Sequence, residues 1–305
     1  MTLHTPVAFF IFRRPDTTRR VFDAIRAARP SKLLIVADGA RTPDEGRIVD
    51  ETRAIVAQVD WDCEVRTQYA PANMGLKARV SSGLDWVFDQ VEEAIILEDD
   101  CLPDPSFFPY CESLLDRYRD EPRVMHISGD CFHRQPAVDG DYYYSRYPHI
   151  WGWATWRRAW ARYDVGMTAW HDPGVRARLL RSFHRSEERL FWRTTWDAVQ
   201  RGDIDTWDYQ WGFSCLLHDG LSINPAVNLI ANIGFGADAT HTIGAGDWKA
   251  SLPTASIPIP PRCPPHMQPD ALLDNRTADH FFTQKTLMQR AMRKARRLLG
   301  MKEKP

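Results

Sequence analysis

The stretch that most constrains the fold is residues 94–100, which read Ala-Ile-Ile-Leu-Glu-Asp-Asp. A short apolar run that ends in charges is typical of a buried parallel strand whose carboxyl end opens into a cleft. Ligands of open α/β sheets bind at such strand ends. Three adjacent carboxylates repel one another unless a cation neutralises them. The stretch therefore indicates either a Mg²⁺ or Mn²⁺ site that serves a diphosphate, or an acidic strand end that caps the next helix.

Composition narrows the class of protein. The 305 residues suffice for one large domain or two small ones, and 39 Lys and Arg balance 40 Asp and Glu, which gives no electrostatic basis for a nucleic-acid partner. The six cysteines lack zinc-site spacing, and the sequence shows neither a signal peptide nor a membrane-length apolar segment. We therefore expect reduced thiols in a cytoplasmic protein. The 12 tryptophans fit either a core or a carbohydrate-binding cleft.

Strand and helix patterns alternate over the first hundred residues. Apolar runs at 7–12, 32–37 and 94–100 and an alternating segment at 63–68 predict strands, and segments with apolar residues at helical spacing lie between them. Asp16 or Thr17 is the expected cap of the first helix. This alternation predicts a parallel α/β sheet with right-handed crossovers.

The second half of the chain differs from the first in its residue pattern and aromatic content. A helix is expected at 103–118 and a strand at 124–128, and aromatic residues become frequent beyond residue 142. Further patterns predict a helical stretch at 174–201, a strand at 220–225 and a proline-rich surface loop at 250–270. Residues 279–299 read as a basic amphipathic helix. Such a helix is either a solvated terminal helix or a peripheral contact with an anionic membrane surface.

Seven short motifs follow one another between residues 5 and 243. They are Phe-Arg-Arg-Pro (12–15), Ala-Asp-Gly (37–39), Asn-Met-Gly-Leu (73–76), Leu-Glu-Asp-Asp (97–100) with 103–108, His-Ile-Trp-Gly-Trp (149–153), Trp-Asp-Tyr-Gln-Trp (207–211), and Asn-Ile-Gly-Phe-Gly (232–236) through 240–242. In this order they resemble nucleotide-sugar-dependent glycosyltransferases of the GT-A fold. The resemblance is to bacterial family 2 or hemolytic-protein-like members, and the motif order is similar to that of eukaryotic N-acetylglucosaminyltransferase I.

The resemblance implies a fold and a division of the chain. The expected fold is α/β and GT-A-like, with a mostly parallel central sheet flanked by helices and an aromatic-rich acceptor half. Residues 1–249 would form the glycosyltransferase domain, with a nucleotide-binding half at 1–135 and an acceptor-binding half at 136–249. Residues 250–305 would add the proline-rich loop and the basic helix.

The resemblance also assigns the donor site. Asp100 matches the direct metal ligand, and Glu98 and Asp99 would face the ribose and metal-bound waters. Asp38 matches the residue that accepts a hydrogen bond from the base, typically uracil. Arg14 matches a base- or ribose-contacting arginine, with Arg13 as the alternative.

Two basic residues follow the Asn-Met-Gly turn. Lys77 and Arg79 would face phosphate, although ordinary helix-surface charge explains them equally well. His241 would supply a late metal or phosphate contact, or is structural.

The acceptor side is expected around the tryptophan motifs. Asp208 matches the general base of inverting relatives, with Asp203 and Asp205 as alternatives. The flanking Trp207 and Trp211 would desolvate that carboxylate and raise its pKa toward the working range of a general base. Trp151, Gly152 and Trp153 would line the donor-sugar and acceptor cleft, since glycine permits close backbone approach.

These features predict an inverting, metal-dependent glycosyltransferase of bacterial polysaccharide biosynthesis. The resemblance implies a nucleotide sugar as donor, with a UDP-sugar as the first expectation, and a glycan, a lipid-linked saccharide or a small molecule as acceptor. A sugar-nucleotide nucleotidyltransferase is an alternative, although the segment after the first strand lacks the glycines of its phosphate loop. A non-catalytic carbohydrate-binding protein with the same fold is another. The expected location is the cytoplasm, or the inner face of the membrane.

Overall fold

The computed structural model describes residues 2–134, 136–234, 248 and 252–282. Its centre is an eight-stranded sheet in the order β3-β2-β1-β4-β8-β6-β9-β7. The first four of these strands are mutually parallel, and β6 also pairs parallel with β9. The other pairs, β4 with β8, β6 with β8 and β7 with β9, are antiparallel. The expected α/β class and the mostly parallel central sheet are thereby confirmed.

The strands of this sheet have the following bounds: β1 Val7–Ile11, β2 Lys32–Ala37, β3 Glu64–Tyr69, β4 Glu93–Glu98, β6 Val124–Ser128, β7 Tyr142–Ser145, β8 Trp153–Trp156 and β9 Leu221–Pro225. A separate antiparallel pair joins β5 (Cys101–Pro103) to β10 (Ile230–Asn232). Because only Asp99 and Asp100 lie between β4 and β5, this pair holds the carboxylate-bearing turn in place.

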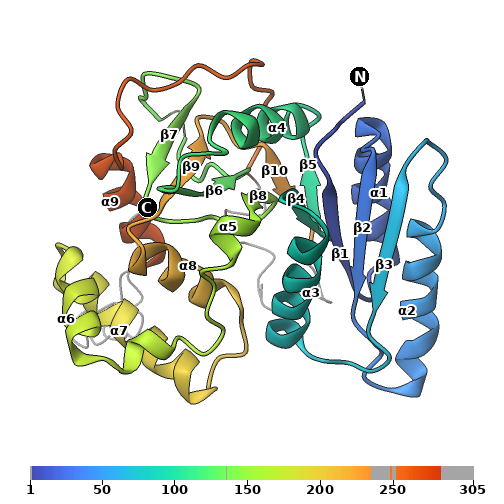
Figure 1. Cartoon of the computed structure of the whole chain (residues 1–305), viewed down its shortest axis with the longest axis horizontal. Helices are drawn as coiled ribbons and strands as arrows, with labels where there is room; N and C mark the ends of the chain where they lie inside the picture. Colours follow the sequence, from blue (N-terminus) through green and yellow to red (C-terminus); the bar gives the residue numbers. More distant parts are fainter. Residues whose placement is uncertain (1, 135, 235–247, 249–251, 283–305) are drawn as a thin grey trace, which may run out of the picture.

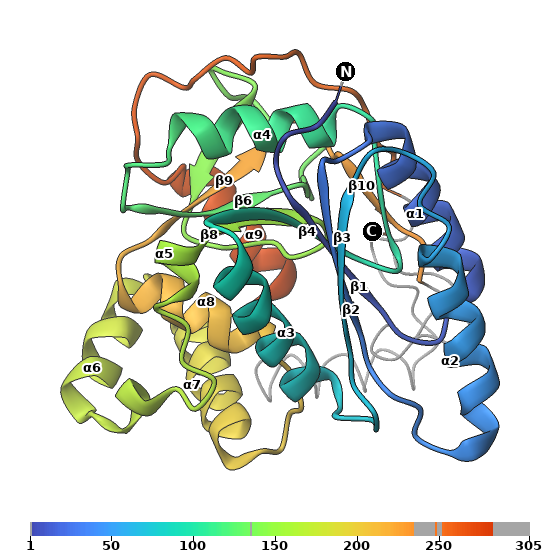
Figure 2. The same cartoon turned by 45° about the vertical axis from the view of Figure 1, so that its right-hand side comes forward.

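Helices cover both faces of the sheet (Figures 1 and 2). Apolar residues of α1, α2 and α4 form one buried cluster with one face of the strands, and residues of α3, α5 and α8 form a second cluster with the other face. The helices α6 and α7 pack with α8 around a third, aromatic cluster at the end of the molecule away from α1 and α2. The helix bounds are α1 Pro15–Ala28, α2 Pro43–Val56, α3 Leu76–Gln90, α4 Phe107–Arg117, α5 Arg157–Trp160, α6 Pro173–Ser182, α7 Ser186–Arg201, α8 Asp208–Leu217 and α9 Ala271–Phe281, and a 3₁₀ turn spans Thr168–His171.

Several element boundaries differ from those that the sequence predicts. The first helix begins at Pro15, and its cap residue is Arg14, which makes no capping bond from its side chain. The helix expected from residue 103 begins at Phe107, because Pro103 belongs to β5. The single helical stretch expected at 174–201 is two helices, α6 and α7. The strands β7 and β8 were not predicted, because all their residues are buried and the aromatic run shows no alternation.

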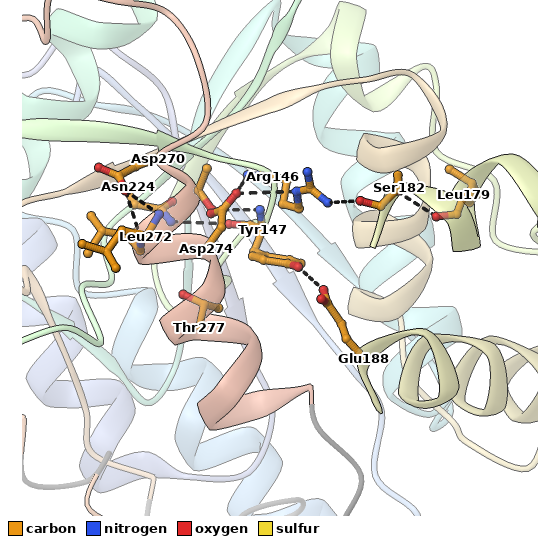
Figure 3. Close-up of polar contacts among 12 residues, drawn as sticks. Arg146, Tyr147, Leu179, Ser182, Glu188, Asn224, Asp270, Leu272, Asp274 and Thr277 are labelled. Atoms are coloured by element: carbon orange, nitrogen blue, oxygen red, sulfur yellow. Dashed lines mark hydrogen bonds and ion pairs between the residues drawn. The ribbon is translucent and has the colours of Figure 1, made fainter. Parts of the chain in front are cut away.

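The C-terminal part of the described chain is fastened to the sheet through Asp274 of α9 (Figure 3). Its carboxylate accepts hydrogen bonds from Ser145 Oγ at 2.6 Å and from the Arg146 backbone N at 3.2 Å. Arg146 Nη1 in turn donates to the Ser182 carbonyl at the end of α6, and the Tyr147 hydroxyl donates to Glu188 of α7. The network therefore joins α9, the end of β7 and the helices of the aromatic cluster.

The remaining expectations concern the tail and the cysteines. Residues 252–270 contain no helix, as expected for a proline-rich loop. Most of the predicted basic helix at 279–299 lies outside the described residues. Its first residues fall at the end of α9, which ends at Phe281. All six cysteines are free thiols, as predicted. Within the described ranges, none of the helices has the length and apolar character needed to cross a membrane.

Candidate functional site

A cavity of ≈ 590 Å³ lies at the carboxyl ends of β1, β2 and β4, facing the start of α8. The parallel pairing of these strands brings residues that are far apart in the sequence to one edge of the sheet. Most of the residues that the sequence nominated as donor or catalytic groups line this cavity: Arg14, Asp38, Arg79, Glu98, Asp99, Asp100, Trp151 and Asp208.

The acidic edge of the cavity is formed by the two aspartates that follow β4. Asp99 Oδ2 accepts a hydrogen bond from the backbone N of Phe12 at 3.1 Å, which ties it to the end of β1. The Asp100 carbonyl accepts a bond from the Ile233 backbone N at 2.8 Å. Arg14 Nη1 lies 2.6 Å from Asp100 Oδ2 and 3.4 Å from Asp99 Oδ1. Arg14 thus contacts the acidic pair, although the resemblance assigns it to the base or ribose.

The electrostatics of this edge reflect crowded negative charge. Burial, followed by the charges of Asp100, Asp99 and Asp208, raises the pKa of Glu98 to about 8, and Arg14 opposes the rise. Burial and the Asp100 charge raise the pKa of Asp99 to about 7. Burial lowers the pKa of Arg14, but Asp99 and Asp100 outweigh that effect and raise it. The edge therefore holds more negative charge than Arg14 neutralises, and additional positive charge would stabilise its ionised form.

The residues at this edge offer a partial metal site. In the described part of the chain, no group of three or more His, Cys, Asp or Glu side chains is arranged to hold a metal ion. Mg²⁺ and similar hard cations, however, are commonly bound through one or two carboxylates, with waters and substrate phosphates completing the shell. The charge and the oxygen donors at Asp100 and Asp99 fit a cation bound in that way. They do not fit a closed site made of protein ligands alone.

At the carboxyl end of β2, Asp38 organises the turn that precedes α3. Its Oδ1 accepts hydrogen bonds from the backbone N of Gly39 at 2.8 Å and of Met74 at 2.9 Å, and its Oδ2 accepts one from Asn73 Nδ2 at 2.9 Å. Asp38 is buried, and it still lines the cavity. The carboxylate expected to contact the base therefore also positions the Asn-Met-Gly turn.

The two basic residues of α3 have different positions. The Arg79 guanidinium lines the cavity and donates from Nη2 to the Gln68 carbonyl at 2.8 Å and to Gln68 Oε1 at 2.9 Å. Burial lowers its pKa. It is therefore fastened to β3 on the Asp38 side. Lys77 is half-buried and is not among the lining residues.

Asp208 enters the cavity from the opposite side, as the first residue of α8. The Thr206 hydroxyl donates a hydrogen bond to its Oδ1. Gln210 Nε2 donates to the Thr206 carbonyl at 2.7 Å, and the Tyr163 hydroxyl donates to the Trp207 carbonyl at 3.2 Å, so the segment before α8 is held on both sides. The alternatives, Asp203 and Asp205, are exposed and do not line the cavity.

Of the two tryptophans in the Trp-Gly-Trp motif, Trp151 lies at the cavity and Trp153 lies in the core. Trp151 lines the cavity, and its backbone N donates to Asp130 Oδ2 at 2.9 Å. Trp153 does not line it, which corrects the expectation: as part of β8 it is 1% exposed, and its ring lies 5.0 Å from His126 and 5.6 Å from Trp207. Gly152 has φ +64°, and a Cβ there would lie 2.5 Å from Ile230 Cδ1. Its close approach within the protein is therefore to Ile230 of the core, and an approach to a ligand stays a prediction.

His241 lies outside the described residues, so its predicted metal or phosphate contact stays a prediction. Sequence reasoning missed several residues that line or shape the cavity, notably Arg41, Thr206 and Asn232. Arg41 lies with its guanidinium 5.2 Å from the centre of the Phe12 ring, and Arg13 lies 5.9 Å from the same centre. Only the position of Arg41 two residues after Ala-Asp-Gly could have suggested it.

Comparisons with known proteins give only distant similarity. No protein-family model matches the sequence, and no curated protein matches it. Among solved structures, the fold is similar to 4-diphosphocytidyl-2C-methyl-D-erythritol synthase from Anaerococcus prevotii, with 13% identity, 52% of this chain and 74% of that chain covered, and a TM-score of 0.31. A UDP-glucose pyrophosphorylase complexed with UDP-glucose matches with 10% identity, coverage of 73% and 90%, and a TM-score of 0.34.

A third solved structure is mouse xyloside xylosyltransferase 1 in its apo form. It is 10% identical, with 70% of this chain and 81% of that chain covered, and a TM-score of 0.35. The three titles name a synthase, a pyrophosphorylase and a xylosyltransferase. At these identities and TM-scores the similarity concerns the general fold, and the function has to be argued from the cavity itself.

Proposed function

We propose that this chain is an inverting, metal-dependent glycosyltransferase that uses a nucleotide sugar, with a UDP-sugar as the first donor to test. The observation that carries the proposal is the meeting of Asp38, Asp100 and Asp208 around one cavity. These residues come from the ends of two parallel strands and the start of a helix more than a hundred positions later. A sugar transfer from a diphosphate requires a group that stabilises the leaving diphosphate and a general base. The acidic edge would provide the first by holding a cation, and the separate carboxylate of Asp208 would provide the second.

The transfer is a single displacement at the anomeric carbon. Asp208 accepts the proton of the acceptor hydroxyl as its oxygen bonds to that carbon. The bond from the anomeric carbon to the phosphate oxygen breaks, and the nucleoside diphosphate leaves with the electron pair. Asp100 would hold a Mn²⁺ or Mg²⁺ ion, with Glu98 and Asp99 facing the ribose and the metal-bound waters, and the ion when bound stabilises charge on the leaving diphosphate. Thr206 holds the Asp208 carboxylate through its hydroxyl.

The proposal also assigns the parts of the chain. Residues 1–135 bind the nucleotide and residues 136–249 bind the acceptor, which is a glycan, a lipid-linked saccharide or a small molecule. For the basic segment within 250–305 two roles stay open, a solvated terminal segment and a peripheral contact with the inner face of the membrane. The assignment of nucleotide binding to residues 1–135 is supported by Asp38 and Asn73. These two residues are hydrogen-bonded to each other and line the cavity at the carboxyl end of β2.

The test is a panel of nucleotide sugars with Mn²⁺, in which release of nucleoside diphosphate and glycosylated acceptor are measured together. We expect Asp208→Asn to lower kcat by at least about 100-fold while the donor still binds, and Asp100→Asn to weaken donor and Mn²⁺ binding together. The matched control is Asp203→Asn, since Asp203 is exposed and pairs with Arg201.

Two results would contradict the proposal. A fully active Asp100→Asn or Asp208→Asn enzyme would remove the assigned groups from the mechanism. Conversion of a nucleotide sugar and pyrophosphate into a nucleoside triphosphate and a sugar 1-phosphate would place the chain among nucleotidyltransferases instead.

A further inference from the structure

Arg14 is the cation in contact with the acidic edge. Its backbone is fixed at the start of α1, where its carbonyl accepts a bond from the Thr18 backbone N at 2.9 Å. Its guanidinium reaches both Asp100 Oδ2, at 2.6 Å, and Asp99 Oδ1, at 3.4 Å. The side chain keeps 20% exposure, so it is shielded enough for a substantial attraction and open enough to move.

The carboxylates, in contrast, are held by the backbone around them. Asp99 is bonded to the Phe12 backbone N, and Asp100 is fastened through its carbonyl to Ile233. The short β5–β10 ladder pairs Cys101 with Asn232 immediately beyond. In this group the long, flexible arginine side chain is the part that can change its partner with little change elsewhere.

Arg14 and a divalent cation would compete for the same oxygen. A cation bound by Asp100 within the cavity would lie a few ångströms from the guanidinium, and like charges at that separation repel in a partly buried site. A diphosphate offers the guanidinium another anion, and its planar fork suits phosphate oxygens. Arg14 therefore has two alternative anionic partners, one in the protein and one in the ligand.

We infer that Arg14 is a displaceable counter-ion. In the absence of nucleotide it occupies the acidic edge and weakens cation binding there, and a nucleoside diphosphate draws it away. Cation and nucleotide binding are then linked, and each raises the affinity for the other by the same factor. The inference rests on the proposed function because it takes the diphosphate to bind beside Asp100.

The test is a direct measurement of Mn²⁺ binding by titration calorimetry and by the electron paramagnetic resonance signal of free Mn²⁺. MnCl₂ is added to the full chain with and without saturating UDP. We expect Arg14→Gln to bind Mn²⁺ alone at least tenfold more tightly than the wild type, and the gain in Mn²⁺ affinity caused by UDP to shrink by a similar factor.

The matched control is Arg13→Gln. Arg13 lines the same cavity, and its substitution removes the same positive charge. Its Nε pairs with Glu45 at 3.2 Å, however, and its side chain is not paired with Asp99 or Asp100. We expect this variant to change the affinity for Mn²⁺ alone by less than threefold. Thermal unfolding of each variant checks that it folds. If Arg14→Gln does not fold, Arg14→Lys replaces it, with an intermediate increase expected because the ammonium group keeps the positive charge but is more strongly hydrated than a guanidinium and lacks its planar donor geometry.

The outcomes separate the inference from the proposed function. If wild-type protein binds Mn²⁺ and UDP cooperatively but the Arg14 variants bind Mn²⁺ alone no more tightly, the inference is wrong and the glycosyltransferase proposal stands. If Arg14→Gln binds Mn²⁺ more tightly but UDP, GDP and CDP all fail to bind either protein, the counter-ion role is supported at the acidic edge and the donor site is refuted. If no protein in the series binds Mn²⁺, both are overturned.

Discussion

Gly234 packs directly against the carboxylate of Asp100. A Cβ added at Gly234 would lie 2.8 Å from Asp100 Cγ and closer still to its Oδ2. The segment is held in this position because the Gly234 backbone N donates to Asn232 Oδ1 at 2.9 Å and the Ile233 backbone N donates to the Asp100 carbonyl. The position of the Asp100 carboxylate is therefore fixed by a segment that lies more than a hundred residues away in the sequence.

Replacing Gly234 tests this arrangement. In Gly234→Ala the new methyl group must displace the Asp100 carboxylate or the segment that follows β10. We expect a cost of about 1–3 kcal/mol in the free energy of unfolding and at least a tenfold weaker affinity for UDP with Mn²⁺, measured by calorimetry. Gly46→Ala is the control, since a Cβ there meets nothing within 4 Å and alanine favours the helix. Unchanged donor affinity in Gly234→Ala would show that Asp100 tolerates the shift.

The hydroxyl of Thr206 should contribute to turnover through Asp208. In Thr206→Val the carboxylate loses a hydrogen bond that favours its charged form. We expect kcat to fall roughly 10- to 100-fold, in line with about 1.5–3 kcal/mol for a hydrogen bond to a charged group, and the acid limb of the pH–rate profile to move to higher pH. Thr18→Val is the control, because the Thr18 hydroxyl is buried without a hydrogen-bond partner among the described residues. A lower kcat with an unmoved pH profile would indicate a purely structural role for Thr206.

Asn73 should support nucleotide binding through Asp38. Its Nδ2 donates to Asp38 Oδ2 at 2.9 Å and to the Gly39 carbonyl at 3.0 Å, so Asn73→Ala removes both bonds. We expect a loss of about 1–3 kcal/mol in unfolding free energy and a several-fold weaker affinity for UDP, from denaturant unfolding and calorimetry. Asn275→Ala, on α9 and outside the cavity, provides the comparison. Equal effects of the two substitutions on UDP affinity would contradict this role.

The two tryptophans of the Trp-Gly-Trp motif should respond differently to substitution. Trp153→Phe should lower the free energy of unfolding by about 1–3 kcal/mol and change the donor Kd by less than twofold, because the ring is buried between His126 and Trp207. Trp151→Phe should leave the melting temperature within a few degrees and change the donor or acceptor KM several-fold, because this ring lines the cavity. The opposite pattern would place the ligand on the Trp153 side.

Stability should depend on pH through Asp274. Burial raises its pKa from the ordinary 3.8 to about 6, with Ser145 and Arg146 opposing the rise. A raised pKa in the folded state means that the protonated form is favoured by folding, so this contribution is complete below about pH 4 and is lost as the pH rises through 6. The loss is at most on the order of 3 kcal/mol. Asp274→Asn should flatten the decline between pH 4 and 6 in a series of melting temperatures, and a parallel decline in both proteins would assign it to other groups.

The local patterns of the first hundred residues were sufficient for most of the nucleotide-binding half. The second strand was predicted at residues 32–37 and is observed at Lys32–Ala37, because a continuous apolar run has one stable place in a parallel sheet. The pattern failed at β8, where Trp153–Trp156 is inserted between β4 and β6 and buried throughout. A run of aromatic residues is equally consistent with a core strand and with a sugar-binding cleft, so only its neighbours could distinguish them.

The order of strands and helices over the first hundred residues and the acidic end of β4 followed from the sequence itself, because hydrophobic periodicity and charge placement act over a few residues. Which side chains meet was decided by the tertiary structure. Arg14 contacts Asp100 because β1 and β4 are parallel neighbours, and Asp208 shares a cavity with Asp100 because the start of α8 faces the carboxyl ends of these strands. Such contacts depend on the packing of distant segments, which a pattern of neighbouring residues does not encode.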